Sequence, residues 1–567
     1  MIRIQGRPGA PGVAKGIAVV MQKKTTEYGR DRDSRSELQR FEDTLAICTK
    51  EMLTLQERLS ETGEESEARI IKAYAMMLQD KTMTNPMKEA ILGGKSAFEA
   101  VDAEVMAISD KLVAMDNAYM RERADDIRHV GSLLKNKLNG EEEIQLPQEP
   151  FVLVAEDLTP VDTLKLDRTY LAGLVTQMGG ATSHTVILAK TMGIPAIIGI
   201  ESVVEKILTG DNLLLDGSTG QIMIQPDDMA LHIFEEQQWE AKKLQKKIKE
   251  KNLSIAATED GYSIEVCCNI GSPEDMQLVK EKIYDGVGLF RTEFLYNAFQ
   301  RYPTFDEQLK AYREVAAAAE GKPVIIRTLD IGGDKHLPYL ELPKEENPFL
   351  GYRAVRISLS RREMFLEQLS AILAAGDNVR IMFPMITQVG ELRDCKELLE
   401  LAKERLREKG IPYNTSPKVG IMVETPACGI MTDRFAKLCD FMSIGTNDLT
   451  QYVTCADRNN PAVEELCTPY NPAMLRLLAQ IANDCKKAGI PIGVCGELAG
   501  NMDYLPFLVG IGIDKLSVSP SSVDLVRFMV CSVKLSKMQM LARQVLELDD
   551  PREIKNILSQ TWKDIIK

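Results

Sequence analysis

Residues 420–427 read Gly-Ile-Met-Val-Glu-Thr-Pro-Ala, and residues 441–448 read Phe-Met-Ser-Ile-Gly-Thr-Asn-Asp, so that two short apolar runs each lead into an acidic side chain. Apolar runs of this length that are bounded by turn residues are typical of buried strands. We therefore expect two strands that present Glu424 and Asp448 near their carboxyl ends.

Six further runs of the same kind extend this pattern over residues 254–567. The eight runs lie at 264–267, 286–290, 324–326, 380–383, 420–423, 441–444, 492–494 and 515–518. Amphipathic stretches such as 391–408 separate most of them, and eight strands that alternate with helices predict a (β/α)8 barrel of the TIM type. A doubly wound open sheet is the competing interpretation.

The side chains that follow the runs favour the barrel. Barrel enzymes build their sites at the carboxyl ends of the strands, where a single reactive side chain means little but a repeated occurrence indicates a site. The side chains in these positions are Arg291, Arg327, Glu424, Asn447, Asp448, Cys495 and Glu497.

The first 253 residues have a different pattern of apolar and polar residues. A short strand is expected at 17–21 after a Gly/Pro turn at 8–12, and helical periodicity from 31 to 138 predicts an all-helical module of about four helices. Short apolar runs typical of a small α/β domain return after Pro147. The expected domains are an α/β domain at 1–29 and 144–228, a helical insertion at 30–143, a linker helix at 229–253 and the barrel at 254–567.

The composition is that of an ordinary globular protein and excludes several classes. The 567 residues are 44% apolar and 27% charged, with a net charge of −14. No apolar run reaches the roughly 18–20 residues that span a bilayer, and the first residues hold no apolar signal core, so we expect a cytoplasmic protein without membrane insertion. The acidic balance argues against nucleic-acid binding. The eleven cysteines include no C-x-x-C pair, so a zinc site is not indicated.

One of only four histidines stands in a context that suits chemistry. His184 follows a Gly-Gly turn at 179–180 and three residues that include two hydroxyls, and an apolar helical pattern begins at Thr185. A helix N-terminus favours an anion such as a phosphoryl group carried on the imidazole. A simple helix cap is the alternative interpretation.

The residues at the strand ends suggest a phosphate-bearing substrate. Arg291 and Arg327 offer planar charged forks for phosphate or carboxylate, and Arg458 adds a third guanidinium. Glu424 and Asp448 are hard oxygen ligands of the kind that Mg²⁺ takes, unless they are an unrelated pair of carboxylates.

Two further side chains in this set have less specific interpretations. Asn447 could hydrogen-bond a substrate oxygen. Cys495, flanked by Gly493 and Gly496, could act as nucleophile, acid or base, although a free cysteine is more often a small buried hydrophobe.

Seven segments together resemble enzyme I of the bacterial sugar phosphotransferase system. They are Gly-Gly-x-Thr-Ser-His at 179–184, Gly-Leu-Phe-Arg-Thr-Glu-Phe-Leu at 288–295, Arg-Thr-Leu-Asp-Ile-Gly-Gly-Asp-Lys at 327–335, Glu-Glu-Asn-Pro-Phe-Leu-Gly-Tyr-Arg at 345–353, Gly-Ile-Met-Val-Glu-Thr-Pro-Ala at 420–427, Ser-Ile-Gly-Thr-Asn-Asp-Leu-Thr-Gln-Tyr at 443–452 and Val-Cys-Gly-Glu-Leu-Ala-Gly at 494–500. The resemblance covers essentially the whole chain in the family's order.

The resemblance implies a phosphoenolpyruvate–protein phosphotransferase with a swivelling phosphohistidine domain and a barrel that binds phosphoenolpyruvate and Mg²⁺. By motif, His184 would be phosphorylated and Cys495 would protonate the enolate carbon to give pyruvate. The implied substrate contacts are Arg291, Arg327, Arg353, Lys335, Asn447, Asp448 and Arg458, and the implied metal ligands are Glu424 and Asp448. The family also implies transfer of phosphate to the carrier protein HPr and a homodimer formed through the barrel.

The sequence departs from the family pattern at several positions. Ala181 stands where the family usually has Arg next to the histidine motif, Gln177 where it has Asp, and Lys190 where it has Arg. These changes bear on the rate of transfer and on the stability of the phosphohistidine. In the carrier-binding block Lys72 and Tyr74 replace what are commonly Glu and His, and Asn501 stands where Asp is common.

Two alternative functions compete with an active enzyme I. A relative of pyruvate phosphate dikinase or phosphoenolpyruvate synthase shares the histidine motif and the barrel, but the chain leaves no room for the nucleotide-binding domain of those enzymes. A regulatory paralogue with weak turnover or a different carrier is suggested by Ala181. Residues 30–143 hold 17 Lys and Arg against 24 Asp and Glu, which gives −7 and favours a basic-faced carrier as the partner.

Overall fold

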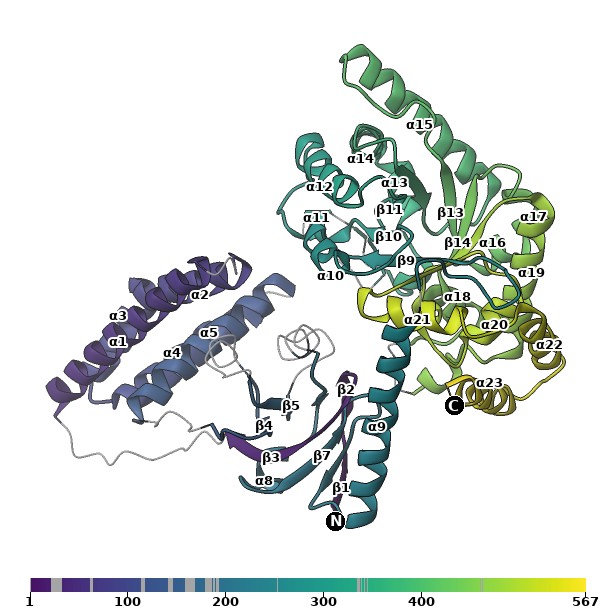
Figure 1. Cartoon of the computed structure of the whole chain (residues 1–567). Coiled ribbons are helices and arrows are strands. Elements are labelled where there is room, and N and C mark those ends of the chain that lie inside the picture. Colours follow the sequence, from purple (N-terminus) through teal and green to yellow (C-terminus); the bar gives the residue numbers. More distant parts are fainter. Residues whose placement is uncertain are drawn as a thin grey trace. The chain divides into compact units, whose positions relative to one another are not determined.

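The computed structural model (Figure 1) describes most of the chain. The described residues are 2–21, 33–61, 65–113, 118–140, 146–158, 169–178, 186, 189, 193–251, 253–333, 337, 339–340, 342–343, 345–458, 460 and 462–566. The chain divides into two compact units, Met1–Glu240 and Ala241–Lys567.

The second unit is built on a closed barrel of eight parallel strands. The strands are β9 (Glu265–Ile270), β10 (Val287–Arg291), β11 (Val324–Arg327), β12 (Val379–Phe383), β13 (Val419–Val423), β14 (Phe441–Ile444), β15 (Ile492–Val494) and β16 (Lys515–Val518). Parallel pairing of β16 with β9 closes the ring, with Leu516 opposite Val266. The predicted barrel is therefore confirmed, and the open doubly wound sheet is excluded.

Alternation along the strands explains why these runs form a barrel. Side chains that point into the ring form a small core of their own. Its members are Leu289, Ile325, Met382, Met422, Phe441 and Cys495. Their neighbours along each strand, such as Phe290 and Ile326, belong to the large outer core under the helices. Because successive side chains of a strand point to opposite faces, one apolar run supplies both cores.

Helices connect the strands of the barrel and cover its outside (Figure 1). They are η1 (Pro273–Asp275), α10 (Met276–Val279), α11 (Glu293–Asn297), α12 (Phe305–Ala318), η2 (Pro348–Leu350), α13 (Val355–Ser360), α14 (Arg362–Leu373), α15 (Val389–Glu408), α16 (Pro426–Ile430), α17 (Thr432–Phe435), α18 (Thr446–Thr454), η3 (Glu464–Leu466), α19 (Pro472–Ala488), η4 (Glu497–Gly500), α20 (Leu505–Gly510), η5 (Pro520–Ser522), α21 (Val523–Val530), α22 (Leu535–Leu546) and α23 (Pro551–Ile566).

The first unit contains an eight-stranded mixed sheet. Its strands are β1 (Ile2–Gln5), β2 (Arg7–Ala10), β3 (Val13–Met21), β4 (Phe151–Ala155), β5 (Leu171–Thr176), β6 (Ala196–Ile198), β7 (Asn212–Asp216) and β8 (Gln221–Ile224), with the short helix α8 (Val203–Lys206) between β6 and β7. The strand order is β1-β8-β7-β3-β4-β5-β6-β2, and the four neighbours from β3 to β6 are parallel.

The Gly/Pro segment near the N-terminus is a strand over part of its length, so the predicted turn at 8–12 is wrong there. Arg7–Ala10 forms the edge strand β2, which pairs antiparallel with β6. An edge strand tolerates Pro8 because a proline lacks only the donor of a ladder hydrogen bond. The turn itself is confined to the end of the segment, where Gly12 takes a positive φ of 127°.

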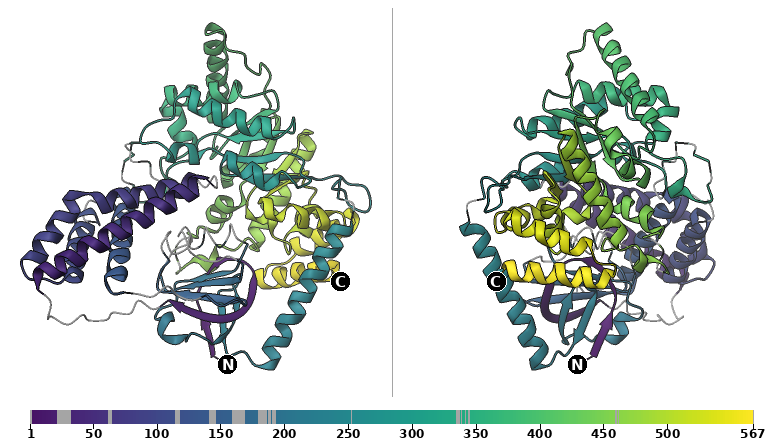
Figure 2. Two further views of the ribbon diagram at one scale, coloured as in Figure 1. Left: turned by 60° about the vertical axis from the view of Figure 1, so that its left-hand side comes forward. Right: turned by 90° about the vertical axis from the view of Figure 1, so that its right-hand side faces the viewer.

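Five helices lie between β3 and β4 in the chain, although those two strands are neighbours in the sheet. They are α1 (Ser34–Glu61), α2 (Glu65–Gln79), α3 (Lys81–Leu92), α4 (Ala97–Val113) and α5 (Ala118–Leu138). They run side by side in both orientations of Figure 2 and share one apolar core. The prediction of four helices missed the break at Asp80, whose side chain accepts from the amide of Thr82 and caps α3.

One long helix leads from the sheet to the barrel. This helix, α9 (Asp228–Glu250), carries the boundary between the two compact units within its length. Within the second unit, Lys251 Nζ donates to the carbonyl of Cys531 at 2.6 Å, just beyond the end of the helix. Among the described residues, no helix combines the length and the apolar character that crossing a bilayer requires.

Candidate active site

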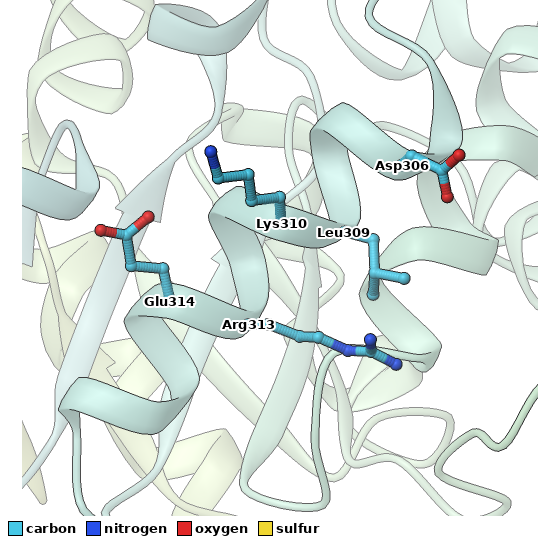
Figure 3. Close-up of a pocket in the computed structure, with 5 residues that line it drawn as sticks. All are labelled: Asp306, Leu309, Lys310, Arg313 and Glu314. Atoms are coloured by element: carbon cyan, nitrogen blue, oxygen red, sulfur yellow. The ribbon is translucent and has the colours of Figure 1, made fainter.

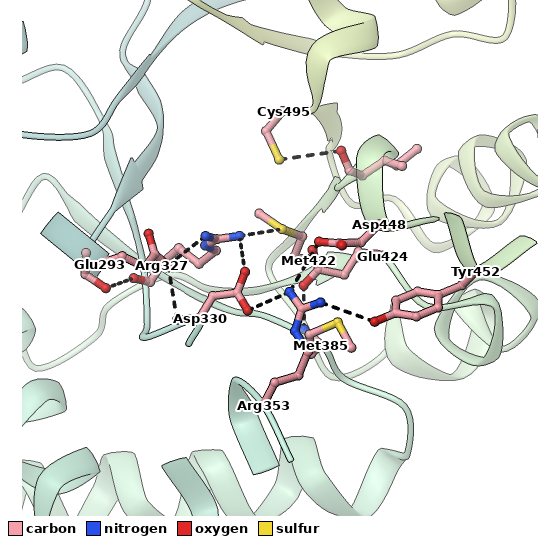
Figure 4. Close-up of polar contacts among 12 residues, drawn as sticks. Glu293, Arg327, Asp330, Arg353, Met385, Met422, Glu424, Asp448, Tyr452 and Cys495 are labelled. Atoms are coloured by element: carbon pink, nitrogen blue, oxygen red, sulfur yellow. Dashed lines mark hydrogen bonds and ion pairs between the residues drawn. The ribbon is translucent and has the colours of Figure 1, made fainter. Parts of the chain in front are cut away.

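A cluster of charged side chains lies at the carboxyl ends of the barrel strands (Figure 4). Arg327 ends β11, Glu424 directly follows β13, and Asp448 lies in the first turn of α18, directly after β14. Glu293, Asp330 and Arg353 come from the segments that follow β10 and β11. Parallel strands of a barrel end at a common rim, so residues as far apart in the chain as Glu293 and Asp448 come together there.

Arg327 is buried between two carboxylates. Its Nη2 lies 2.8 Å from Glu293 Oε1, and its Nη1 lies 3.0 Å from Asp330 Oδ2. Although burial disfavours the charged guanidinium, Glu293 and Asp330 raise the pKa of Arg327 above its usual value. Arg327 is therefore a fixed positive charge in a site from which water is largely removed.

Arg353 is held in a similar way from the other side of the cluster. Its Nη2 lies 3.0 Å from Asp330 Oδ1 and 3.5 Å from Asp448 Oδ2, while Nη1 donates to the hydroxyl of Tyr452 at 3.3 Å. Tyr452 in turn donates to the carbonyl of Phe349, in the loop that precedes Arg353. These contacts connect the loop, the arginine and α18.

Glu424 and Asp448 form the acidic side of the site. The amide of Met385 donates to Glu424 Oε1 at 2.7 Å, and Met385 has a positive φ of 56°, a strained conformation for a non-glycine residue. Burial and then the negative charges of Asp330 and Asp448 raise the pKa of Glu424 to about 8. This excess of buried negative charge is what a divalent cation would neutralise.

The thiol of Cys495 lies inside the barrel, next to this cluster. Cys495 is 2% exposed, and its Sγ lies 3.5 Å from the carbonyl of Ile444. Burial raises the pKa of the thiol to about 11, and the positive charges of Arg327 and Arg291 partly offset this rise. At neutral pH Cys495 therefore carries its proton and suits the role of an acid.

Glycines bring the backbone close around the thiol. An added Cβ on Gly496 would lie 1.9 Å from the hydroxyl oxygen of Thr446, and one on Gly445 would lie 2.8 Å from Glu424 Oε2. Such separations are shorter than any real contact, so both positions need glycine for the strand ends to pack together.

The structure brings most of the predicted site residues together. Arg327, Arg353, Glu424 and Asp448 share one network, and Arg458 Nη1 lies 3.5 Å from Asp448 Oδ1. Two predicted residues lie outside this network: Arg291 is exposed at the rim, and Asn447 accepts a hydrogen bond from the amide of Glu497 at 3.2 Å.

The remaining predicted site residues, His184 and Lys335, lie outside the described residues. Ala181 and Lys190, which depart from the family pattern, do so as well.

Several buried polar atoms at this site have no hydrogen-bond partner within the described part of the chain. They are Arg327 Nε, Arg353 Nε, Arg458 Nη1, Asp448 Oδ1 and Thr446 Oγ1. The ion pair between Arg458 and Asp448 is close enough for attraction but does not have hydrogen-bond geometry. Buried polar atoms are normally paired, so donors and an acceptor gathered at one rim indicate a polar ligand.

Three residues of the network were not predicted as site residues. Glu293 and Asp330 lie within the quoted motifs, two and three residues beyond Arg291 and Arg327, and Tyr452 lies at the fourth position after Asp448. Their nearness in the sequence to predicted site residues was the signal available. It does not show which arginine each of them contacts.

A shallow depression on the outside of the barrel illustrates the contrast with this site (Figure 3). Asp306, Lys310, Arg313 and Glu314 all project from α12 and are exposed. The side chains of the depression come from a single helix, whereas those in Figure 4 converge from several strand ends. The depression therefore lacks the geometry of a binding site.

Comparison with known families identifies the class of enzyme to which the chain belongs. Residues 244–535 match the family described as PEP-utilising enzyme, PEP-binding domain, residues 147–220 match its mobile domain, and residues 5–123 match its N-terminal domain. The barrel with its rim of arginines and carboxylates is thus of the class of phosphoenolpyruvate-utilising enzymes.

Curated relatives narrow this class to one family. The phosphoenolpyruvate-protein phosphotransferase of Enterococcus faecalis is 40% identical over 578 residues, which cover 99% of each chain. That of Listeria innocua is 38% identical and covers 98% of this chain and 99% of its own. That of Bacillus subtilis is also 38% identical and covers 99% of this chain and 100% of its own. The chain belongs to the phosphoenolpyruvate–protein phosphotransferase, or enzyme I, family. The resemblance inferred from the motifs is confirmed.

Proposed function

We propose that this chain transfers the phosphoryl group of phosphoenolpyruvate to its own His184 and then to a histidine of an HPr-type carrier protein. The observation that carries the proposal is the buried network of Arg327, Arg353, Glu424 and Asp448 at one rim of the barrel. It offers two buried Nε donors that have no hydrogen-bond partner among the described residues, which suits the phosphate or carboxylate of a small anion.

The donor set also fits a magnesium ion. Mg²⁺ is commonly held by one or two carboxylates together with oxygens of the substrate. Glu424 and Asp448, whose Oδ1 accepts no hydrogen bond from the described residues, would provide the carboxylates. Bound Mg²⁺ would neutralise charge on the phosphoryl oxygens.

In the proposed first step, an imidazole nitrogen of His184 forms a bond to phosphorus as the bond from phosphorus to the enol oxygen breaks. Arg291 and Arg327 would hold the phosphoryl oxygens, with Arg353, Arg458, Asn447 and Lys335 as further contacts carried over by motif. The enolate then takes the proton of Cys495 at its terminal carbon and becomes pyruvate. A thiol with a pKa of about 11 keeps that proton until a strong base such as an enolate is present.

The partners and surroundings follow from the same assignment. The helices α1–α5 belong to residues 30–143, whose net charge of −7 suits a basic-faced carrier. In this block Lys72 is exposed, whereas Tyr74 is buried and its hydroxyl lies 3.1 Å from His129 Nδ1. Tyr74 therefore shapes the core between α2 and α5 rather than the carrier surface. We also propose the domain boundaries given above, a homodimer through the barrel and a cytoplasmic location.

A radioactive labelling assay tests this function. The wild-type protein and His184→Ala would each be incubated with labelled phosphoenolpyruvate and Mg²⁺. We expect label on the wild type, its loss in the variant, and its passage to purified HPr. An unlabelled wild-type protein would contradict the proposal.

A regulatory paralogue with a different carrier or weak turnover remains the second candidate, and Ala181 is the observation that favours it. Ala181 cannot supply the guanidinium that the family usually places beside the phosphohistidine. Restoring it with Ala181→Arg distinguishes the two functions. If the regulatory function is correct, the substitution raises the labelling rate by an order of magnitude or more, whereas an efficient wild-type enzyme changes little.

A further inference from the structure

Asp330 is a buried carboxylate that two of the proposed phosphate-binding arginines share. It lies three residues beyond Arg327 and is 2% exposed. Its Oδ2 is 3.0 Å from Arg327 Nη1, and its Oδ1 is 3.0 Å from Arg353 Nη2. One carboxylate thus bridges two guanidinium groups, each through one oxygen (Figure 4).

The protein engages the terminal nitrogens of both arginines but leaves the Nε donors unused. Arg327 directs its two Nη groups to Asp330 and Glu293, and Arg353 directs its own to Asp330 and Tyr452. In both arginines Nε is buried and has no hydrogen-bond partner among the described residues. The shared carboxylate therefore engages the guanidinium groups without occupying the Nε donors, which remain for a ligand.

The backbone around Asp330 is itself fixed. Its amide donates to Glu293 Oε1 at 3.2 Å, the same oxygen that accepts from Arg327. Two residues further on, Gly332 has a φ of 108°, and a Cβ there would lie 2.5 Å from Arg353 Cβ. The segment that carries Asp330 is thus packed directly against the residue whose side chain it binds.

We propose that Asp330 is the positioning residue of the phosphate site: it holds Arg327 and Arg353 so that their free Nε donors serve one phosphoryl group. This inference rests on the function proposed above. Without the shared anion, the two guanidinium groups would repel each other, and Arg353 would be drawn further toward Asp448, a proposed metal ligand. Asp330 thereby keeps the arginines available for substrate.

The opposite role would make a different prediction. If Asp330 instead competed with the substrate for the arginines, its neutralisation would free positive charge and tighten the binding of anions. Positioning and competition therefore predict changes of opposite sign in the affinity for phosphate.

The test uses the full-length protein with Asp330→Asn, which keeps the shape of the side chain but removes its charge. We expect kcat/KM for phosphoenolpyruvate to fall by about 10- to 100-fold, mostly in kcat, as is usual for groups that orient a charged site. Affinity for inorganic phosphate, measured by calorimetry, should fall as well. Asp330→Glu, which retains the charge, should recover part of the loss and provides a second variant if Asp330→Asn does not fold.

Asp285→Asn is a matched control because Asp285 also pairs with a buried arginine in the same unit, 2.6 Å from Arg527 Nη1, but away from the site. It should leave kcat/KM and phosphate affinity unchanged. Unchanged kinetics in Asp330→Asn, or tighter phosphate binding, would overturn the positioning role. If the wild type binds phosphate but takes no label, the proposed function fails, while the calorimetric comparison still decides the role of Asp330.

Discussion

The two ends of the barrel both carry charged side chains, but they arrange them differently. At the amino end a cavity of about 550 Å³ is lined by Glu265, Arg380, Lys486, Asp514 and Lys515, together with apolar side chains. Lys486 is exposed, and Lys515 pairs with the half-exposed Glu265 at 2.7 Å. At the carboxyl end Arg327, Asp330 and Arg353 are buried and share partners, and within the described part of the chain the Nε atoms of both arginines make no hydrogen bond.

The cavity at the amino end shows that volume alone does not identify the active site of the barrel. At the amino end the carboxylate of Asp514 accepts from the hydroxyl of Tyr262 and the amide of Ile492, which serves the packing of the strands. At the carboxyl end several buried polar atoms have no hydrogen-bond partner among the described residues, which lowers stability unless a ligand provides one. We therefore propose that the function of the barrel is concentrated at its carboxyl rim.

The largest effect is expected from Arg327→Met. The substitution removes a buried charge and leaves Glu293 and Asp330 without their partner, which should lower the free energy of unfolding by about 3–5 kcal/mol. The loss of a phosphate-binding guanidinium should lower the labelling rate by about 1,000-fold. Urea unfolding and initial labelling rates measure the two effects. Labelling near the wild-type rate would mean that the phosphate binds elsewhere.

Cys495→Ala should have the next largest effect. Removing the buried acid should lower kcat for pyruvate formation by about 100-fold, while KM for phosphoenolpyruvate changes little. Steady-state assays of pyruvate release measure this. Cys485→Ala is a suitable control because Cys485 is also a buried thiol of the barrel but contacts Met442, near the start of β14. Equal losses in the two variants would indicate a packing effect only.

A third prediction concerns the pH dependence of alkylation. Because burial raises the pKa of Cys495 to about 11, its thiolate fraction, and with it the rate of reaction with iodoacetamide, should rise by about tenfold per pH unit below that value. The exposed Cys455 should react first at neutral pH. Mass spectrometry of the labelled peptides follows both. A Cys495 rate that levels off near pH 7 would contradict a role as a protonated acid.

The smallest effect is expected at the amino end of the barrel. Arg380→Ala should change labelling by less than about twofold and the free energy of unfolding by less than about 0.5 kcal/mol, as for a surface substitution. The same two assays used for Arg327→Met apply. A loss of labelling here would remove the distinction between the two ends.

The fold was predictable from the sequence where the pattern was periodic. Eight apolar runs separated by amphipathic stretches predicted all eight barrel strands, because each strand needs both an inner and an outer apolar face. Two local predictions were wrong. A turn was predicted at Pro8, but an edge position in the sheet allows a strand to contain proline there. One helix too few was predicted, because the capping residue Asp80 divides two helices. Both depend on neighbours that periodicity does not reveal.

The site was predictable only in part. Residues at or directly after strand ends, such as Arg327 and Glu424, could be predicted because a barrel brings strand ends together. Asp330 and Tyr452 act through contacts between segments about 100 residues apart or less, and nothing in their own sequence context indicates which arginine they bind. The role of His184 rests on its motif and remains a prediction.

The central claim is that phosphoryl transfer depends on the carboxyl end of the barrel. The most direct test measures label transferred from radioactive phosphoenolpyruvate in two variants side by side, Glu424→Gln at the carboxyl end and Lys515→Gln at the amino end. We predict no label above the His184→Ala background in the first variant and nearly wild-type labelling in the second. Wild-type labelling of Glu424→Gln, or loss of labelling in Lys515→Gln alone, would contradict the account.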